Sequence, residues 1–161
     1  MIPPAPIDSP AALTRFIELH YHERHREELR DLAAMATRVE QRHAGHNGVP
    51  DGLSVLLQRM IGTMEVHMKK EELILFPAIR RGGMPGIETP IAVMRADHDE
   101  HAEDIAEIRR LTNDLRPPVG ACRTWSALYA GLSGFLDALK DHIDLENDIL
   151  FPPFEQAARH A

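Results

Sequence analysis

Four long segments of the chain repeat apolar residues every three or four positions, and stretches rich in glycine and proline separate them. The separating stretches fall at about residues 43–52, 80–86 and 113–122, and a proline-rich segment covers residues 1–10. A three-to-four-residue period is the spacing of one helix face, whereas glycine and proline interrupt helices. The pattern therefore predicts four helices, at about residues 11–43, 51–80, 88–114 and 121–158.

Each predicted helix has an inward stripe in which histidine, and in two helices glutamate, interrupts the apolar residues. From the first helix to the fourth, the stripe positions are Leu19, His22, Leu29, Leu32, Ala36 and Val39; Leu53, Leu56, Met60, Met64, His67, Glu71 and Ile74; Ile91, Met94, His98, Ile105 and Ile108; Leu128, Leu132, Phe135, Leu139, His142, Glu146 and Ile149. Polar side chains on a buried face need a partner or a function.

The same pattern predicts the fold class. No segment alternates polar and apolar residues with the period of two that strands show. Four amphipathic helices with short connections pack most simply as an up-down-up-down four-helix bundle. We therefore expect an all-α protein with one domain over residues 1–161.

Helix ends can also be predicted from local chemistry. Asp8 or Ser9 ahead of Pro10, Asp51, and Thr89 ahead of Pro90 are suitable helix starts. Proline lacks the amide hydrogen that a helix needs, so Pro77 and Pro152 should end or kink their helices.

Two of the helices contain an internal repeat. The sequence HMKKEELILFP at residues 67–77 returns as HIDLENDILFP at residues 142–152. In each copy a histidine precedes a glutamate by four residues, which places both side chains on one face of a helix, one turn apart. One further histidine lies upstream of each copy: His22 in YHERH and His98 in DHDEH. The chain thus consists of two similar halves.

The two buried glutamates, Glu71 and Glu146, require compensation. An ionised carboxylate without a partner in an apolar interior costs more than the roughly 5–15 kcal/mol that stabilises a whole domain. The nearest basic residues, Lys69, Lys70 and Lys140, fall on other helix faces. Two metal ions would compensate both glutamates and use the histidines as well. We therefore predict a metal centre whose ligands are His22, His67, Glu71, His98, His142 and Glu146.

The identity of the metal is less constrained than its ligands. Imidazole and carboxylate together suit iron, manganese, zinc and copper. Two metals bridged by two carboxylates favour iron or manganese, and zinc remains an alternative.

Other histidines have different expected roles. His25 and His101 each follow a ligand by three residues, so either is a candidate fifth imidazole or a partner of the ligands. His43 lies roughly 31 Å beyond His22 along a helix and cannot share the site. The carboxylates that flank the ligands can accept an imidazole N–H; they are Asp97, Asp99, Asp141 and Asp144.

Composition limits the classes of partner. The net charge of −7 provides no basic surface for nucleic acid or an anionic membrane. No apolar run approaches the roughly 18 residues of a membrane-spanning helix. The single cysteine, Cys122, cannot form an internal disulfide, and no signal-like start is present. We expect a cytoplasmic protein.

The chain resembles the hemerythrin-like proteins, and most closely their iron-sulfur cluster repair branch. The resemblance covers almost the whole chain through YHERHREEL, VPDGL, EVHMKKEELILFP, VMRADHDEHAE and DHIDLENDILFP. It implies a non-haem di-iron centre with an oxo or hydroxo bridge, held by the same six residues. It also implies a role in recovery from nitric oxide or peroxide damage.

One feature departs from that branch. Many of its members carry an N-terminal extension with two adjacent cysteines, whereas Cys122 is the only thiol here. The leading hypothesis is a di-iron protein that binds NO or O2 and serves damaged iron-sulfur proteins. The alternatives are an O2 carrier or sensor without turnover, an enzyme that reduces NO or removes peroxide, and a metal-free bundle that only binds partners.

Overall fold

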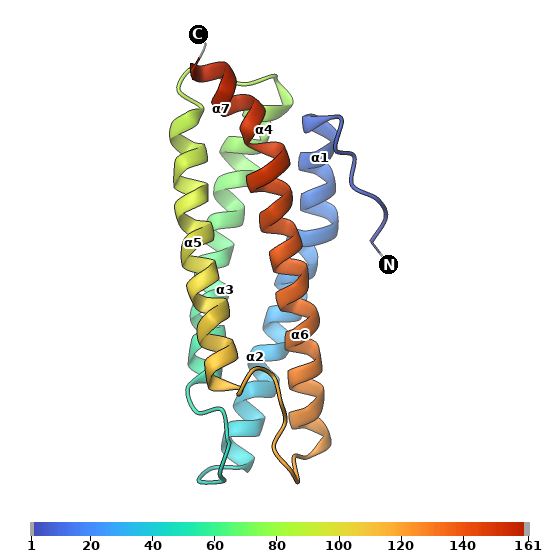
Figure 1. Cartoon of the computed structure of the whole chain (residues 1–161), viewed down its shortest axis with the longest axis vertical. Coiled ribbons are helices and arrows are strands. Elements are labelled where there is room, and N and C mark those ends of the chain that lie inside the picture. The colour runs from blue at the N-terminus through green and yellow to red at the C-terminus, as the bar shows by residue number, and fades with distance from the viewer. Residues whose placement is uncertain (1, 160–161) are drawn as a thin grey trace.

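A computed structural model of the chain describes residues 2–159, so Met1, His160 and Ala161 lie outside the described residues. The described residues form four long helical rods (Figure 1). In chain order the rods are α1 (Pro10–Ile17), η1 (Glu18–His22) and α2 (Glu23–Arg42); α3 (Leu53–Lys70), η2 (Glu71–Leu75) and α4 (Phe76–Arg80); α5 (Glu88–Leu111); and α6 (Arg123–Asp144), η3 (Leu145–Leu150) and α7 (Pro152–Arg159).

Successive rods run in opposite directions. The loops α2–α3 and α5–α6 lie at one end of the bundle, and the turn from α4 to α5 lies at the other, beside α7 (Figure 1). No strand occurs within residues 2–159. The prediction of an all-α, up-down-up-down four-helix bundle is therefore confirmed.

Three of the rods contain a π turn, in which each hydrogen bond spans five residues instead of four. The amides of Glu23, Phe76 and Phe151 donate to the carbonyls five residues earlier, which belong to Glu18, Glu71 and Glu146. Such turns add one residue to a helical turn and are frequent at functional sites. Here they coincide with predicted ligands in all three rods.

The π turns explain how the prolines of the repeat are accommodated. A proline in an α-helix collides with the carbonyl four residues earlier. For Pro77 and Pro152 that carbonyl lies inside η2 and η3, where the turn is wider. Pro77 does not end its rod, which continues directly from η2 into α4. Pro152 follows a bend at Phe151 and begins a new helix, as predicted.

The extra residue in each π turn also changes which side chains face inward. Leu19 is 59% exposed and Ile74 is 56% exposed, so their predicted inward positions are wrong. Both lie within π turns. The side chains that pack in these regions include Tyr21 and Leu75, each four residues from another buried position.

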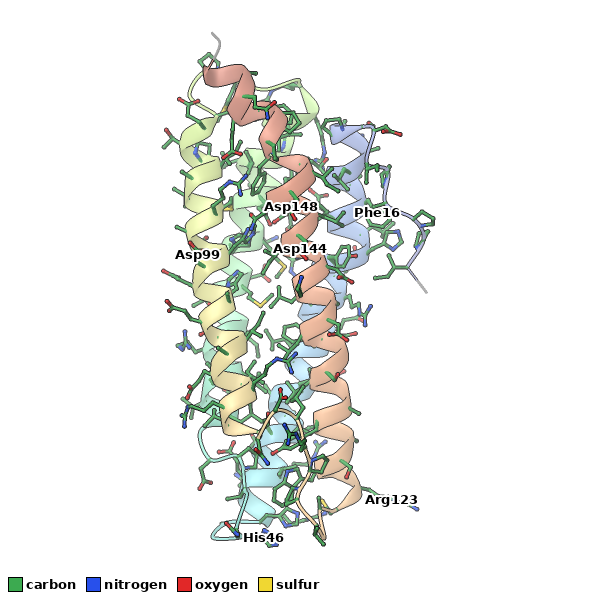
Figure 2. All side chains as sticks on the ribbon, viewed as in Figure 1. Phe16, His46, Asp99, Arg123, Asp144 and Asp148 are labelled. Atoms are coloured by element: carbon green, nitrogen blue, oxygen red, sulfur yellow. The ribbon has the colours of Figure 1, made fainter. Side chains whose placement is uncertain are left out.

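Two apolar clusters fill the bundle, one on each side of the predicted ligands (Figure 2). The larger cluster surrounds Met60, Trp125 and Phe135. The smaller cluster contains Phe76 and Phe151, the aromatic residues of the two repeat copies. Burial of each such side chain stabilises the fold by roughly 1.5–3 kcal/mol. The candidate ligands therefore lie in a buried section of the bundle, between the two clusters.

Helix starts agree only in part with the predictions. The Ser9 hydroxyl accepts a hydrogen bond from the amide of Ala12, as predicted. Asp51 does not cap α3; the Glu40 carboxylate accepts from the amides of Gly52 and Ser54 instead. Gly52 has a φ of 94°, which glycine adopts without strain. The Thr89 prediction is also wrong, since α5 begins at Glu88 without a side-chain cap.

Candidate metal centre

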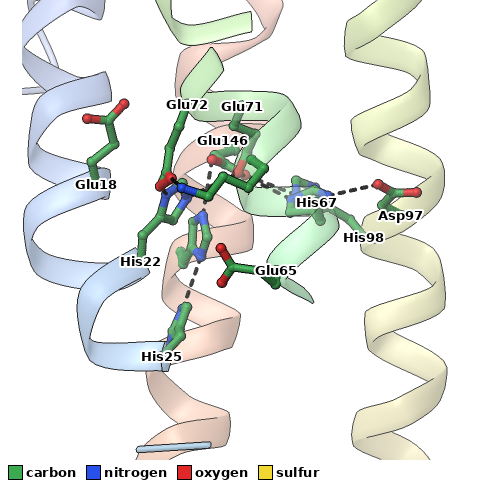
Figure 3. Close-up of polar contacts among 12 residues, drawn as sticks. Glu18, His22, His25, Glu65, His67, Glu71, Glu72, Asp97, His98 and Glu146 are labelled. Atoms are coloured by element: carbon green, nitrogen blue, oxygen red, sulfur yellow. Dashed lines mark hydrogen bonds and ion pairs between the residues drawn. The ribbon is translucent and has the colours of Figure 1, made fainter. Parts of the chain in front are cut away.

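The six predicted ligands come together in the middle of the bundle (Figure 3). All four rods contribute, and the π turns η1, η2 and η3 contain three of the six residues. None of the six residues is more than 2% exposed. They are His22, His67, Glu71, His98, His142 and Glu146.

The six residues form two groups of four donors. Within each group the candidate ligand atoms lie within 4.8 Å of one another. Glu71 and Glu146 belong to both groups, so each glutamate can serve two cations at once. One group adds His22 and His142, which we call the first site, and the other adds His67 and His98, which we call the second site. Each site therefore combines one histidine from the first half of the sequence with one from the second half.

The contacts inside the first site are short. Nε2 of His22 lies 3.1 Å from Oε1 of Glu71, and Nε2 of His142 lies 3.1 Å from Oε2 of Glu146. The first contact has hydrogen-bond geometry, whereas the second does not.

The nitrogen–oxygen contacts inside the second site also lack hydrogen-bond geometry. Nε2 of His67 lies 3.3 Å from Oε1 of Glu71, and Nε2 of His98 lies 2.9 Å from Oε1 of Glu146. Neither nitrogen has a hydrogen-bond partner among the described residues, and both oxygens of Glu146 also lack one. Buried polar atoms are rarely left unpaired. Atoms that crowd together without facing one another suit ligands arranged around a common cation, so the donor set fits metal.

A second layer of side chains fixes three of the histidines from outside. The Nδ1 atoms of these rings lie within hydrogen-bond distance of oxygen acceptors, with separations between 2.7 and 3.1 Å. The pairs are His22 with Glu72, His67 with Asp97, and His98 with Asn147. When Nδ1 donates to an oxygen, Nε2 is left free to bind metal.

Only part of this outer layer could be predicted from the sequence. The prediction for Asp97, as an acceptor beside a ligand histidine, is confirmed. Asp99 and Asp141 are instead exposed, and Asp144 pairs with Lys140 at 2.6 Å. Glu72 and Asn147 were not predicted. Each directly follows a repeat glutamate, so the repeat itself contained the signal.

His142 has an unusual outer partner, the Nε2 atom of His25, at 3.1 Å. His25 is fully buried and packs edge-on against Phe135, with ring centroids 5.5 Å apart. If Nδ1 of His142 donates, then Nε2 of His25 accepts, and His25 cannot bind metal through that nitrogen. Neither His25 nor His101 belongs to a donor group. His43 contacts Cys122 at the distant end of the bundle, at 3.2 Å.

Carboxylates control the protonation of the histidines around Glu71. Burial alone would lower the pKa of His22, but hydrogen bonds with Glu71 and Glu72 raise it to about 9. Burial likewise opposes protonation of His67, and the charge of Glu71 outweighs it and raises the pKa to about 9. Protonated imidazoles can therefore balance the carboxylates, and a metal must displace their protons.

The charge around Glu146 is balanced in a related way. Burial alone would raise the pKa of Glu146, but the neighbouring His98 lowers it, so this carboxylate is ionised. Burial opposes protonation of His98, and Glu146 nevertheless raises its pKa. Burial, reinforced by the charge of His22, lowers the pKa of His142 well below its usual range. Neutral His142 is ready to bind a cation.

An arginine supports the outer layer on one side. Arg26 donates to Glu72 at 2.8 Å and to Glu65 at 2.8 Å, which ties α2 to α3 and η2. The hydrogen bond with His22, followed by the one with Arg26, lowers the pKa of Glu72 to about 2 despite partial burial. Lys69 and Lys70 contact Glu72 and Asp97 from the surface, so neither reaches the inner glutamates.

None of the helices within residues 2–159 is long and apolar enough to cross a membrane. The bundle and the donor set together define a helical protein whose interior could hold cations. The chain belongs to the hemerythrin HHE cation binding domain family, which matches residues 17–154.

Similar proteins include several named iron-sulfur cluster repair protein YtfE. The one from Edwardsiella ictaluri (strain 93-146) is 45% identical over 148 residues, which are 92% of this chain and 66% of the relative. Those from Escherichia coli (strain K12 / DH10B) and Shigella boydii serotype 18 are 44% identical over 142 residues, or 88% of this chain and 64% of theirs. The chain thus spans about two thirds of the length of these relatives.

Proposed function

We propose that the chain is a non-haem di-iron protein that binds NO or O2 and takes part in repair of iron-sulfur centres after nitrosative or oxidative stress. In this proposal residues 1–161 form one di-iron domain with an oxo or hydroxo bridge between the irons. The protein acts in the cytoplasm, where its single cysteine, Cys122, remains a free thiol.

The sharing of both glutamates by two donor groups carries the proposal. A carboxylate has two oxygens and can bridge two cations, so Glu71 and Glu146 would bridge a pair. The first site adds His22 and His142, and the second adds the other two histidines. Mixed nitrogen and oxygen donors without thiolate suit iron.

Each site offers two histidines and two shared carboxylates, which is fewer than the six donors of an octahedral ion. When bound, a pair of irons supplies one-electron redox chemistry and coordination positions for small diatomic molecules. The protein holds the imidazoles in place through Glu72, Asp97, Asn147 and His25. The two apolar clusters exclude bulk water from both ends of the centre.

The role in repair rests on the relatives. Their name describes iron-sulfur cluster repair, and the similarity covers 92% of this chain in one case. Damaged iron-sulfur proteins are therefore the proposed partners. The bundle is proposed to supply the iron chemistry of that process.

Metal analysis and spectroscopy test the proposal. Purified protein should contain about two irons per chain and show oxo-to-iron charge transfer in the near ultraviolet and visible. His67→Ala and Glu71→Ala should lose iron, whereas His46→Ala, an exposed histidine outside the site, should keep it. Full iron content in the His67 and Glu71 variants would refute the site.

An O2 carrier or sensor is the second candidate, favoured by the match to the hemerythrin family itself. It predicts a stable, reversible O2 adduct and no reaction with NO. Reduction of NO or removal of peroxide as an enzyme would instead require multiple turnovers with a defined product. Measuring product per iron under excess NO separates the three possibilities.

A further inference from the structure

The second histidines of the two H-x-x-H pairs have different surroundings. YHERH places His25 after His22, and DHDEH places His101 after His98, at equivalent positions of the two halves. His25 is occupied by its contact with His142 at 3.1 Å. Within the described residues, His101 holds no ligand histidine in this way, because Asp97 and Asn147 already serve the rings of the second site.

His101 nevertheless lies against the second site. Its ring centroid is 4.9 Å from that of His67, in an edge-on arrangement, and 6.2 Å from that of His98. The side chain is 4% exposed, and its Nε2 atom is shielded from solvent with no hydrogen-bond partner among residues 2–159. It falls outside both donor groups, so its nitrogens are not placed as a metal ligand.

The ring of His101 also forms part of the wall of a surface groove between α3 and α5. The groove has a volume of about 500 Å³, and Thr63 and Val66 lie on the α3 side. Ion pairs cross between the two helices nearby: Arg59 with Asp104 at 2.7 Å, and Lys70 with Asp97 at 3.4 Å. His101 therefore lies between the surface groove and the second site.

A neutral imidazole has one nitrogen that donates a hydrogen bond and one that accepts one. A neutral donor with a buried, uncommitted nitrogen suits a hydrogen bond to a small polar molecule at the second site.

We propose that His101 is a ligand-binding residue, which donates a hydrogen bond from Nε2 to the small molecule taken up at the second site. The inference rests on the proposed function and adds to it a difference between the two metal positions. A diatomic molecule at the second site meets a hydrogen-bond donor. At the first site the equivalent nitrogen, Nε2 of His25, is already committed to its contact with His142.

The experiment uses NO with the reduced, iron-loaded full chain. We compare the wild type with His101→Leu, which removes the donor, with His101→Gln, which restores one, and with His20→Leu as a control. His20 is half-buried against Phe16, with ring centroids 4.6 Å apart, and lies outside both sites. Iron content, the rate of NO release and the N–O stretching frequency are measured for each.

All variants should keep about two irons. His101→Leu should release NO roughly fivefold faster or more, as loss of one hydrogen bond predicts. Its N–O stretch should shift to higher frequency, because a hydrogen bond to the oxygen weakens the N–O bond. His101→Gln should return both properties towards the wild type, and His20→Leu should leave them unchanged.

Two results would overturn the inference while leaving the proposed function intact: unchanged NO release and N–O frequency in His101→Leu, or a drop to about one iron, which would make His101 a metal ligand. A wild type that holds two irons but takes up no NO would overturn NO binding in the proposed function, and the inference with it. Circular dichroism identifies any variant that fails to fold. If His101→Leu is one of them, the comparison of His101→Gln with the wild type decides the outcome.

Discussion

His25 and His142 form a buried contact between two imidazoles, with Nε2 of one 3.1 Å from Nδ1 of the other. The other three candidate histidine ligands each face an oxygen acceptor from Glu72, Asp97 or Asn147. A carboxylate makes the histidine that it contacts a stronger donor to metal than a neutral imidazole does. Each site thus combines one histidine backed by a carboxylate with one backed by a neutral group.

Removal of His25 should weaken metal binding without removing a ligand. In His25→Ala the ring of His142 loses the contact that orients it, and loss of such an outer partner typically costs roughly 10–100-fold in metal affinity. Competition with a chelator of known affinity measures the effect. His25→Gln, whose amide oxygen can accept from Nδ1, should recover part of it.

The matched control for this measurement is His46→Ala, at an exposed position in the distant α2–α3 loop. Its affinity should equal that of the wild type. An unaltered affinity in His25→Ala would mean that packing against the first site is enough to orient His142.

Loss of a shared glutamate should have a greater effect on metal content than loss of a histidine. Glu71 belongs to both donor groups, whereas His142 belongs only to the first site. Glu71→Ala should therefore bind fewer than one iron per chain, and His142→Ala about one. Metal analysis after gel filtration gives the count, and equal iron content in the two variants would contradict the shared arrangement.

Metal removal should destabilise the bundle. A ligand present at a thousand times its dissociation constant stabilises the folded state by about 4 kcal/mol. For a domain of this size each kcal/mol changes the midpoint by roughly 2–4 °C, so a strong chelator should lower it by about 10 °C. Differential scanning calorimetry measures the shift. A midpoint that is identical with and without chelator would favour the metal-free, partner-binding alternative.

The contact between α2 and α6 depends on a missing side chain. A Cβ added at Gly131 would meet Cδ2 of Leu32 at 2.8 Å, whereas one at Gly134 would meet nothing within 4 Å. Gly134→Ala should stabilise the protein by about 0.5–1 kcal/mol through helix propensity. Gly131→Ala has the same benefit but must displace a buried methyl group, and should be less stable than Gly134→Ala by about 1 kcal/mol or more. Urea denaturation of the pair provides the test.

The π turn η2 makes a prediction about two adjacent side chains. Leu75 is 1% exposed and Ile74 is 56% exposed. Leu75→Ala should cost about 2–5 kcal/mol, as truncation in a packed core does, whereas Ile74→Ala should cost less than about 1 kcal/mol. Denaturation midpoints of the two variants decide it. Similar losses at both positions would mean that the rod is an ordinary α-helix there.

The number, order and packing of the helices could be predicted because apolar periodicity reports directly on which helix faces are buried. The six candidate ligands could be predicted because the repeat marks them twice. In contrast, the prediction that Leu19 and Ile74 face inward was wrong, because it assumed a constant period of 3.6 residues per turn. A π turn adds a residue without any local signal except the proline that follows, and η1 lacks even that.

The outer layer illustrates a second limit. Asp97 was among four flanking aspartates that all appeared equally suitable in the sequence. Only its position opposite His67, on a neighbouring rod, distinguishes it from the exposed Asp99. His25 contacts His142 across 117 positions of sequence, and no local pattern contains such a contact. Partners fixed by tertiary packing require the structure.

Each site takes one histidine and one glutamate from each half of the chain. If every ligand is replaced by its counterpart in the other half, the first site becomes the second and the second becomes the first. A single half, with two helices, therefore cannot assemble a complete set of four donors. Two identical copies of such a half could do so as a symmetric pair. The bundle is thus built as a fused dimer would be, with its chemistry placed at the seam between the former partners.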